Sequence, residues 1–326
     1  MRYIIIGAGA VGGSIGGKLF GQGHEVVLVA RGKHYDALRT DGLRLATPEG
    51  TLTVGVPVVD GPHALEARDD DVLVLATKTQ DSAAALDAWA ARPTSAPVVC
   101  AQNGVENERL ALRGFRDVYG MCVRTPATYL EPGLIAVAGS PRPGVLHLGR
   151  YPGGVDDTAR RIAADLESAG YLAPVVPDVM RWKYGKLVGI NLKNAVEAIT
   201  GPITSEDARE VARLAAEEGE AALRAAGIDF TGAADHAEYQ GKFTAAPVEG
   251  TDRAGGSTWQ SLARSAGSIE VDYLNGEVVL LGRTHGVPTP VNVILQRIAN
   301  EFARERSAPG ELSAAELREF AESVRG

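Results

Sequence analysis

The chain has 326 residues, a formal net charge of −8 and 45% hydrophobic residues. This length is enough for two domains that each bury a core. The acidic balance excludes a global basic field that would draw the protein to nucleic acid or an anionic membrane. The N-terminal apolar run is too short to span a bilayer and carries no cleavable signal pattern, so we expect a cytoplasmic protein. Neither Cys100 nor Cys122 lies in a cluster with metal-ligand spacing, so we expect buried free thiols and no metal site.

The N-terminal residues combine an apolar strand, a glycine-rich turn and a helix. Residues 3–6 predict the strand and the helix starts at about residue 11, so Gly7, Gly9 and Gly12 form a GxGxxG motif between them. The first glycine permits the turn, the second lets the backbone approach a pyrophosphate, and the third lets the helix pack on the strand. A glycine turn without a ligand is the poorer interpretation, because a second strand completes a βαβ unit. The residues expected to hold the dinucleotide at the positive end of the helix are Gly7, Ala8, Gly9, Ala10, Val11 and Gly12.

The end of the second strand, residues 25–29, indicates which dinucleotide binds. NAD-binding units place an acidic residue about 20 residues beyond the glycines, where it accepts a hydrogen bond from the ribose 2′-OH. Here Ala30 and Arg31 follow the strand, and no acidic residue is present at that end. Because a guanidinium group matches phosphate oxygens in two-point geometry, the sequence favours NADP(H), with Arg31 on the 2′-phosphate. Whether Lys33 joins Arg31 is left open, as is the alternative of a solvated basic loop.

The rest of the first half alternates strands with helices, which predicts a parallel sheet covered on both faces. The expected strands are residues 72–76, 97–101 and 118–123, and the expected helices are residues 81–91 and 107–114. Residues 134–138 and 145–148, flanked by Gly and Pro, predict a hairpin at the sheet edge. A helix over residues 156–169 and a short strand over residues 172–176 follow, and Pro177 marks a break.

Beyond Pro177 the sequence becomes helical and rich in alanine. The expected helices are residues 179–198, 205–226, 257–263, 271–285, 290–306 and 311–324, the last with Ser313 as its N-cap. Residues 228–256 predict a long ordered loop with a short helix. The expected fold class is therefore α/β, with an N-terminal Rossmann-type doubly wound sheet in an NADP(H)-binding domain (residues 1–177). An all-helical C-terminal domain (residues 178–326) is expected to supply the substrate-binding and catalytic residues.

Polar side chains follow two of the expected strands. Lys78 comes just after the strand that ends at residue 76, and Asn103 just after the one that ends at residue 101. In isolation Lys78 would be a surface lysine and Asn103 part of an ordinary turn, because Asn and Gly favour turns. Since ligands of open α/β sheets bind outside the carboxyl ends of the strands, we expect both residues in the wall of the cofactor site.

The helix expected over residues 179–198 carries lysines and asparagines among apolar residues. At about 100° per residue, Lys186 and Asn194 lie on one face about 80° apart. A partly desolvated lysine there would have a lowered pKa suited to proton transfer near neutral pH, whereas a lysine that extends to solvent is the ordinary outcome. Further along, Ser257 is the first residue of one expected helix, and Glu270 directly precedes another. Taken alone, Glu270 would be an acidic residue at a helix N-terminus, stabilised there by the helix dipole.

In chain order these motifs resemble the ketopantoate reductase (2-dehydropantoate 2-reductase) family. The matching positions span nearly the whole chain and are Gly7, Gly9, Gly12, Lys78, Gln102-Asn103-Gly104, Lys186-Leu187, Ser257, Glu270, Asp272-Tyr273 and Asn275-Gly276. The family reduces the 2-keto group of ketopantoate with NADPH on the pathway to pantothenate and coenzyme A.

The resemblance implies a role for each matching polar residue. Lys186 would be the general acid, and Glu270 would hold Lys186 and the developing hydroxyl group in place. Asn103 would position nicotinamide and substrate, Ser257 would bind the substrate carboxylate, and Asn194 would also bind the substrate. These roles suit the chemistry, because hydride addition builds alkoxide charge that a placed ammonium group stabilises and neutralises.

The chain departs from the family pattern at the substrate asparagines. The family has asparagines four and eight residues after the catalytic lysine. Here Asn194 fills the eighth position, but Ile190 fills the fourth, and Asn191 comes one step later, about 100° around the helix. Two further family asparagines correspond to Thr204 and Ala254. The resemblance therefore predicts intact reduction machinery with fewer polar contacts to the substrate, each worth about 1–3 kcal/mol.

The leading hypothesis is an NADPH-dependent reductase of a small-molecule 2-keto acid, with ketopantoate as substrate. Two alternatives stay open: a paralogue that reduces another 2-oxo acid or a ketone, and a non-enzymatic NADP(H) sensor. A sensor needs neither Lys186 nor Glu270, so their presence counts against it. Apolar faces on a helical second domain are compatible with a homodimer, but the sequence leaves open the oligomeric state, the exact substrate and the stereochemical preference.

Overall fold

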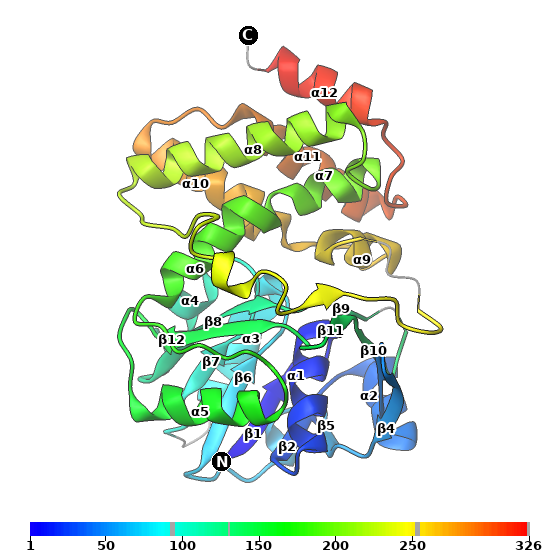
Figure 1. The fold of residues 1–326 in the computed structure, drawn as a ribbon, viewed down its shortest axis with the longest axis vertical. Helices are drawn as coiled ribbons and strands as arrows, with labels where there is room; N and C mark the ends of the chain where they lie inside the picture. Colours follow the sequence, from blue (N-terminus) through cyan, green and yellow to red (C-terminus); the bar gives the residue numbers. More distant parts are fainter. Residues whose placement is uncertain (92–94, 130, 252–254, 325–326) are drawn as a thin grey trace. The chain divides into compact units, whose positions relative to one another are not determined.

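The computed structural model describes residues 1–91, 95–129, 131–251 and 255–324 (Figure 1). They form two compact units. The α/β unit comprises Met1–Gln102, Glu106–Trp182 and Asp235–Arg253, and the helical unit comprises Asn103–Val105, Lys183–Ala234 and Ala254–Gly326. Two short segments thus belong to a different unit from their sequence neighbours. The single domain boundary expected between residues 177 and 178 stays a prediction.

A seven-stranded sheet forms the centre of the α/β unit. Its spatial order is β12 (Val145–Arg150), β8 (Val118–Arg124), β7 (Val98–Cys100), β6 (Asp71–Leu75), β1 (Arg2–Ile6), β2 (Glu25–Val29) and β5 (Val58–Val59). All neighbours are parallel except β12, which runs antiparallel to β8. From β5 to β8 this is the doubly wound dinucleotide-binding order, in which the direction of winding reverses between β1 and β6. The predicted α/β class is confirmed.

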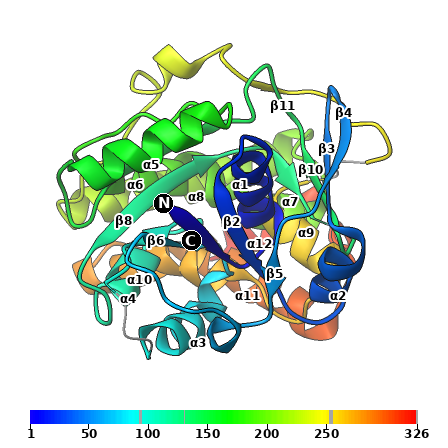
Figure 2. The same ribbon diagram turned by 90° about the horizontal axis from the view of Figure 1, so that it is seen from below.

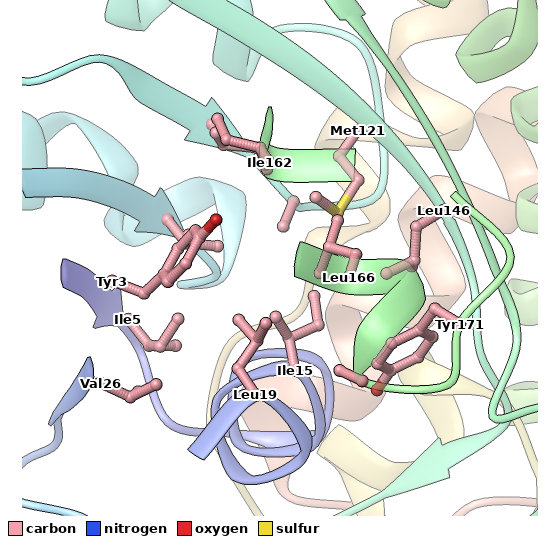
Figure 3. Packing of buried hydrophobic residues seen from close by; sticks show 14 of the residues in the cluster. Tyr3, Ile5, Ile15, Leu19, Val26, Met121, Leu146, Ile162, Leu166 and Tyr171 are labelled. Atoms are coloured by element: carbon pink, nitrogen blue, oxygen red, sulfur yellow. The ribbon is translucent and has the colours of Figure 1, made fainter. Parts of the chain in front are cut away.

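Helices cover both faces of this sheet. Strand alternation sends Tyr3 and Ile5 to one face and Ile4 and Ile6 to the other, and all four are buried. The first face packs on α1 (Ala10–Gly21) and α5 (Asp157–Ser168), as Figure 3 shows for Ile15, Leu19, Ile162 and Leu166. The second face packs on α3 (Thr79–Ala90) and α4 (Asn107–Ala111), and Figure 2 shows α3 across the sheet from α1 and α5. Each large aliphatic side chain buried in these layers contributes about 1.5–3 kcal/mol to the stability of the unit. This packing holds the ends of the strands in place.

The predicted hairpin of residues 134–138 and 145–148 is wrong. Its first half, β10 (Leu134–Val137), belongs to a separate four-stranded sheet, in the order β4 (Gly50–Val54), β3 (Leu43–Thr47), β10 and β9 (Ala127–Thr128). Its second half is β12 in the main sheet. Between them, β11 (Gly139–Ser140) pairs with β13 (Thr244–Ala245). The hairpin does not form because this distant pairing takes up the connecting residues.

The strand predicted over residues 172–176 forms no continuous ladder. This segment runs parallel to β12 and makes isolated bridges to it through Leu172 and Val175, with main-chain hydrogen bonds along both. Pro174 lies between them and has no N–H group to donate to a ladder. Cys100 and Cys122 are buried free thiols in β7 and β8, as predicted.

An aromatic cluster holds residues 235–251 within the α/β unit. The ring of His147 stacks on Trp182 at 3.7 Å between centroids, and Tyr239 meets it edge-on at 4.8 Å. His147 is fully buried, and neither ring nitrogen has a hydrogen-bond partner in the described part of the chain. Burial, with help from His236 and Arg124, lowers the pKa of His147 to about 3, so the ring is neutral.

The helical unit is built from amphipathic helices. After the end of α6 (Val179–Lys186) they are α7 (Lys193–Thr200), α8 (Glu206–Ala225), α9 (Ser257–Ala263), α10 (Asn275–His285), α11 (Pro290–Glu305) and α12 (Ala314–Ser323). Side-chain oxygens of Ser205 and Ser313 cap α8 and α12, and Ser313 forms a capping box with Glu316, which confirms its predicted role. Among the helices of the described residues, none is both long and apolar enough to cross a membrane.

Two predicted helices are interrupted. The helix predicted over residues 179–198 contains a π-turn over Leu187–Asn191, closed by a bond from the N–H of Leu192 to the carbonyl of Leu187 at 3.1 Å. The one predicted over residues 271–285 is preceded by a 3-10 turn, Glu270–Tyr273, and begins as an α-helix only at Asn275. The π-turn directly follows Lys186 and the 3-10 turn begins at Glu270, two residues that the sequence assigned to the site.

Candidate functional site

The glycine-rich loop has the geometry of a dinucleotide-binding turn. Gly7 has φ of +99°, and a Cβ there would lie 2.8 Å from the main-chain nitrogen of Thr77, so the ends of β1 and β6 require glycine. A Cβ at Gly12 would overlap the carbonyl oxygen of Gly7 and lie 2.8 Å from Ile5 Cγ2. Gly9 differs, because a Cβ there would meet no atom within 4 Å. The fold therefore requires Gly7 and Gly12, whereas the space before Gly9, at the N-terminus of α1, is open to a ligand.

The basic residues expected at the 2′-phosphate lie at the start of α2 (Gly32–Asp41). Arg31 is the N-cap residue of this helix, and Lys33 lies in its first turn. Both side chains are exposed, and Ala30 occupies the position directly after β2. The arrangement suits an anionic group at the end of β2, and the assignment of Arg31 to a 2′-phosphate stays a prediction.

A buried polar network joins the ends of β6 and β7. Ser82 Oγ donates to Asn107 Oδ1 at 2.7 Å and accepts from Gln102 Nε2 at 3.1 Å, while Asn107 Nδ2 donates to Thr79 Oγ1 at 3.1 Å. Lys78 is the N-cap residue of α3, directly before Thr79. The network therefore ties the turn that carries Lys78 to the residue that precedes Asn103.

In the helical unit, two of the predicted site residues touch. Lys186 Nζ donates to Asn103 Oδ1 at 2.5 Å. The next residue, Gly104, has φ of +76°, and a Cβ there would lie 3.0 Å from the carbonyl oxygen of Tyr273. That carbonyl ends the 3-10 turn that begins at the buried Glu270. Lys186 thus contacts a residue 83 positions earlier in the chain, and the residue beside that one approaches the turn that begins at Glu270.

A second pair of predicted residues meets at the start of α9. Asn194 Nδ2 donates to Ser257 Oγ at 3.3 Å. Glu197, one turn further along α7, accepts from the main-chain N–H of Gly256 at 2.7 Å. The structure therefore adds a carboxylate beside the serine that the resemblance assigns to the substrate.

Comparison with known proteins identifies the chain. It matches the model described as "Ketopantoate reductase PanE/ApbA" over residues 3–153 and the one described as "Ketopantoate reductase PanE/ApbA C terminal" over residues 178–303. The chain belongs to the ketopantoate reductase family.

Individual members agree with this assignment. A 2-dehydropantoate 2-reductase of Archaeoglobus fulgidus is 30% identical over 297 residues, which are 89% of this chain and 94% of that relative. The crystal structure of a PanE/ApbA family ketopantoate reductase from Ralstonia eutropha JMP134 has a TM-score of 0.78 at 30% identity and covers 94% of this chain and 99% of that one. D-mandelate dehydrogenase, solved with NADH and anilino(oxo)acetate, reaches 0.80 over 94% and 100% of the two chains, but at 19% identity it shares the fold alone.

The π-turn changes how the ketopantoate reductase pattern maps onto this helix. A ring closed between residues i and i+5 holds one more residue than an α-helical ring. Asn191, five residues after Lys186, therefore takes the place that the fourth residue has in an α-helix. The expectation that Asn191 lies about 100° away from that place assumed an unbroken helix and is wrong. Asn191 is 2% exposed, and its Oδ1 has no hydrogen-bond partner in the described residues.

The π-turn is supported from a neighbouring helix. Asn275 Nδ2 donates to the carbonyl of Leu192, directly after the turn, at 3.2 Å and to Asn292 Oδ1 at 3.0 Å. Asn292 in turn donates to Glu218 on α8. Asn275, matched in the family motif without a stated role, thus helps fix the main chain between Lys186 and Asn194.

Other family positions contribute less, and some contacts lie outside the sequence pattern. Thr204 is exposed in the turn before α8, and its hydroxyl donates to the carbonyl of Pro202. Ala254 lies outside the described residues. Sequence reasoning missed Glu197, although its spacing of three residues from Asn194 places both on one helix face.

Proposed function

We propose that this family member catalyses the NADPH-dependent reduction of ketopantoate (2-dehydropantoate) to pantoate, a step of pantothenate biosynthesis in the cytoplasm. The contact between Lys186 Nζ and Asn103 Oδ1 carries the proposal, because it supports a proton donor beside Asn103, which follows β7 by three residues. The open space before Gly9 suits the pyrophosphate of a nicotinamide cofactor. When bound, that cofactor supplies the hydride.

Lys186 is the general acid. Hydride addition to the keto carbon converts the C=O double bond into an alkoxide, and the ammonium group of Lys186 donates one proton to that oxygen. The products are a 2-hydroxy acid and the oxidised cofactor, and solvent returns the proton to the lysine. Before the reaction Asn103 Oδ1 accepts one N–H of the ammonium group, which fixes the direction of the others. A positioned acid of this kind contributes about 10²–10⁴-fold to the rate.

The remaining polar residues hold the substrate. Glu270 accepts a hydrogen bond from the hydroxyl group that forms and keeps Lys186 oriented. Ser257 and Asn194 contact the carboxylate of the substrate. Asn191 adds an acceptor for the hydroxyl group that ketopantoate carries besides its keto group, because its Oδ1 is buried and has no hydrogen-bond donor among the described residues. A buried acceptor without a partner destabilises the protein by about 1–3 kcal/mol, and a substrate hydroxyl offsets this penalty.

Arg31 selects NADPH over NADH. Arg31 is the N-cap residue of α2 and follows the end of β2, where a dinucleotide-binding unit holds the adenosine ribose of its dinucleotide. Lys33 contributes a second positive charge in the same turn.

One observation favours a different substrate. The Glu197 carboxylate lies against Gly256 and thus beside Ser257, where it would repel a substrate carboxylate. The alternative function is therefore the reduction of another 2-oxo acid or a ketone that presents a hydrogen-bond donor to Glu197 and Ser257.

A panel of 2-keto acids and ketones, each assayed with NADPH and with NADH by absorbance, tests these proposals. Oxidation of NADPH by ketopantoate, with a clear preference over NADH, is expected. Turnover of a different carbonyl compound alone would select the alternative. Tight NADPH binding without turnover of any carbonyl, together with indifference to Lys186→Ala, would indicate a sensor.

A further inference from the structure

A buried histidine links the glycine loop to two other parts of the α/β unit. His34 lies in the first turn of α2 and is 8% exposed. Its Nε2 lies 2.8 Å from the carbonyl oxygen of Ala8, and its Nδ1 accepts the main-chain N–H of Gly133 at 3.0 Å. The ring also packs on Tyr129, at 4.6 Å between centroids.

The two contacts permit a single protonation state. A carbonyl oxygen can only accept, so Nε2 carries the hydrogen. A main-chain N–H can only donate, so Nδ1 must be unprotonated. Burial lowers the pKa of His34, which agrees with a neutral ring. The side chain therefore acts as a donor toward the glycine loop and as an acceptor toward Gly133.

The bond to Ala8 fixes a peptide plane in the loop. The carbonyl of Ala8 and the N–H of Gly9 belong to one planar trans peptide, so they point in opposite directions. Because His34 holds the carbonyl, the N–H of Gly9 is directed away from His34. The preceding peptide is held as well, since the N–H of Ala8 donates to the carbonyl of Val29 at 3.1 Å. Among the described residues no side chain hydrogen-bonds to Gly9 itself, so the bond from His34 to Ala8 is the side-chain restraint on this amide.

We propose that His34 is a positioning residue for the cofactor, and that its Nε2–H bond to Ala8 aims the Gly9 amide at the pyrophosphate. This inference rests on the proposed binding of a nicotinamide dinucleotide at the glycine loop. His34 also lies three residues after Arg31 on the same helix turn. One side chain thus sets the separation between the pyrophosphate amide and the cation expected at the 2′-phosphate.

Two substitutions separate the two hydrogen bonds. In His34→Asn the side-chain oxygen replaces Nδ1 and keeps the acceptor for Gly133, but the donor to Ala8 is lost. In His34→Gln the amide nitrogen reaches the place of Nε2 and keeps that donor. His63→Asn, at a histidine that is 75% exposed, is the control.

The binding of NADPH and of adenosine 2′-monophosphate, which has no phosphate at the 5′ position, is measured by calorimetry for the full chain. We expect His34→Asn to weaken NADPH about tenfold, the upper range for one hydrogen bond, with a matching rise in the KM for NADPH and little change in kcat. The monophosphate should bind as tightly as to the wild type, and His34→Gln should weaken NADPH by less than about threefold.

Several results would overturn the inference. The first is an unchanged NADPH affinity in His34→Asn. The second is an equal loss of affinity for both ligands, which would indicate a displaced α2. The third is a greater loss of NADPH affinity in His34→Gln than in His34→Asn. If His34→Asn does not fold, a tenfold loss in a folded His34→Gln also refutes it. A wild-type protein that binds neither NADPH nor NADH would instead refute the proposed function.

Discussion

Alanine substitutions at two glycines of the same loop should differ in effect, one lowering the stability of the protein and the other its affinity for NADPH. In Gly12→Ala the new methyl group overlaps the main-chain oxygen of Gly7 and presses on Ile5. Neither the backbone nor the buried isoleucine can yield easily, so the free energy of unfolding should fall by about 1–3 kcal/mol. For a domain of this size, the corresponding fall in Tm is roughly 3–10 °C.

Gly9→Ala introduces the same methyl group without a steric conflict. Gly9 has φ of −72° and ψ of −159°, which alanine adopts readily, and no atom lies within 4 Å of the new carbon. The stability of the free protein should therefore change by less than about 0.5 kcal/mol. The methyl group occupies the space proposed for the pyrophosphate, so the affinity for NADPH should fall about tenfold or more, or about 1.4 kcal/mol.

Thermal unfolding with and without NADPH measures both effects. At a concentration of about 100 times the wild-type Kd, NADPH stabilises the wild type by about 2.7 kcal/mol. A tenfold weaker Gly9→Ala variant would retain about 1.4 kcal/mol of this. The reasoning fails if Gly9→Ala without cofactor is as unstable as Gly12→Ala, or if NADPH stabilises Gly9→Ala as much as the wild type.

Three further predictions concern the chemistry, the cofactor and pH. Lys186→Ala should lower kcat about 10²–10⁴-fold while the Kd for NADPH stays nearly unchanged. Stopped-flow absorbance measures the rate, and an unchanged kcat would contradict the role of Lys186 as the general acid. Arg31→Ala should raise the KM for NADPH and leave that for NADH nearly unchanged, so equal losses would refute the 2′-phosphate assignment. The pKa of His147 is about 3 in the folded protein and about 6.5 when unfolded, so its contribution to stability is complete above about pH 6.5 and is lost as the pH falls toward 3. His147→Phe should therefore flatten the dependence of urea unfolding on pH over that interval, and an unchanged slope would show that other groups cause it.

The sequence predicted those features that depend on residues close together in the chain. The strand at residues 25–29 follows from its local apolar pattern, the start of the last helix follows from its Ser313 cap, and the main sheet follows from the alternation of strands and helices. For the network around Ser82 and the contact between Lys186 and Asn103, the sequence could predict only that the residues lie near one another, because parallel strands end at one edge of the sheet. Their hydrogen bonds depend on tertiary packing.

Other features had no local signal. Residues 134–138 have the pattern of an edge hairpin, but β10 pairs with β3, some 90 residues earlier. The roles of His34 and Gly133 depend on contacts between elements 99 residues apart. Helical periodicity also assumes a constant number of residues per turn, so the position of Asn191 could not be obtained by counting from Lys186.

The π-turn has a consequence for chain length. One residue added to an α-helix rotates everything after it by about 100°, which would turn the buried side of α7 out of its contacts with α8 and α9. Here the extra residue is confined to a single turn, so α7 remains in place. Gly189 is exposed there, and a side chain at its position would meet no atom within 4 Å. A protein one residue shorter at Gly189 could close the same turn as an ordinary α-helix, with an asparagine still at the place that Asn191 takes here.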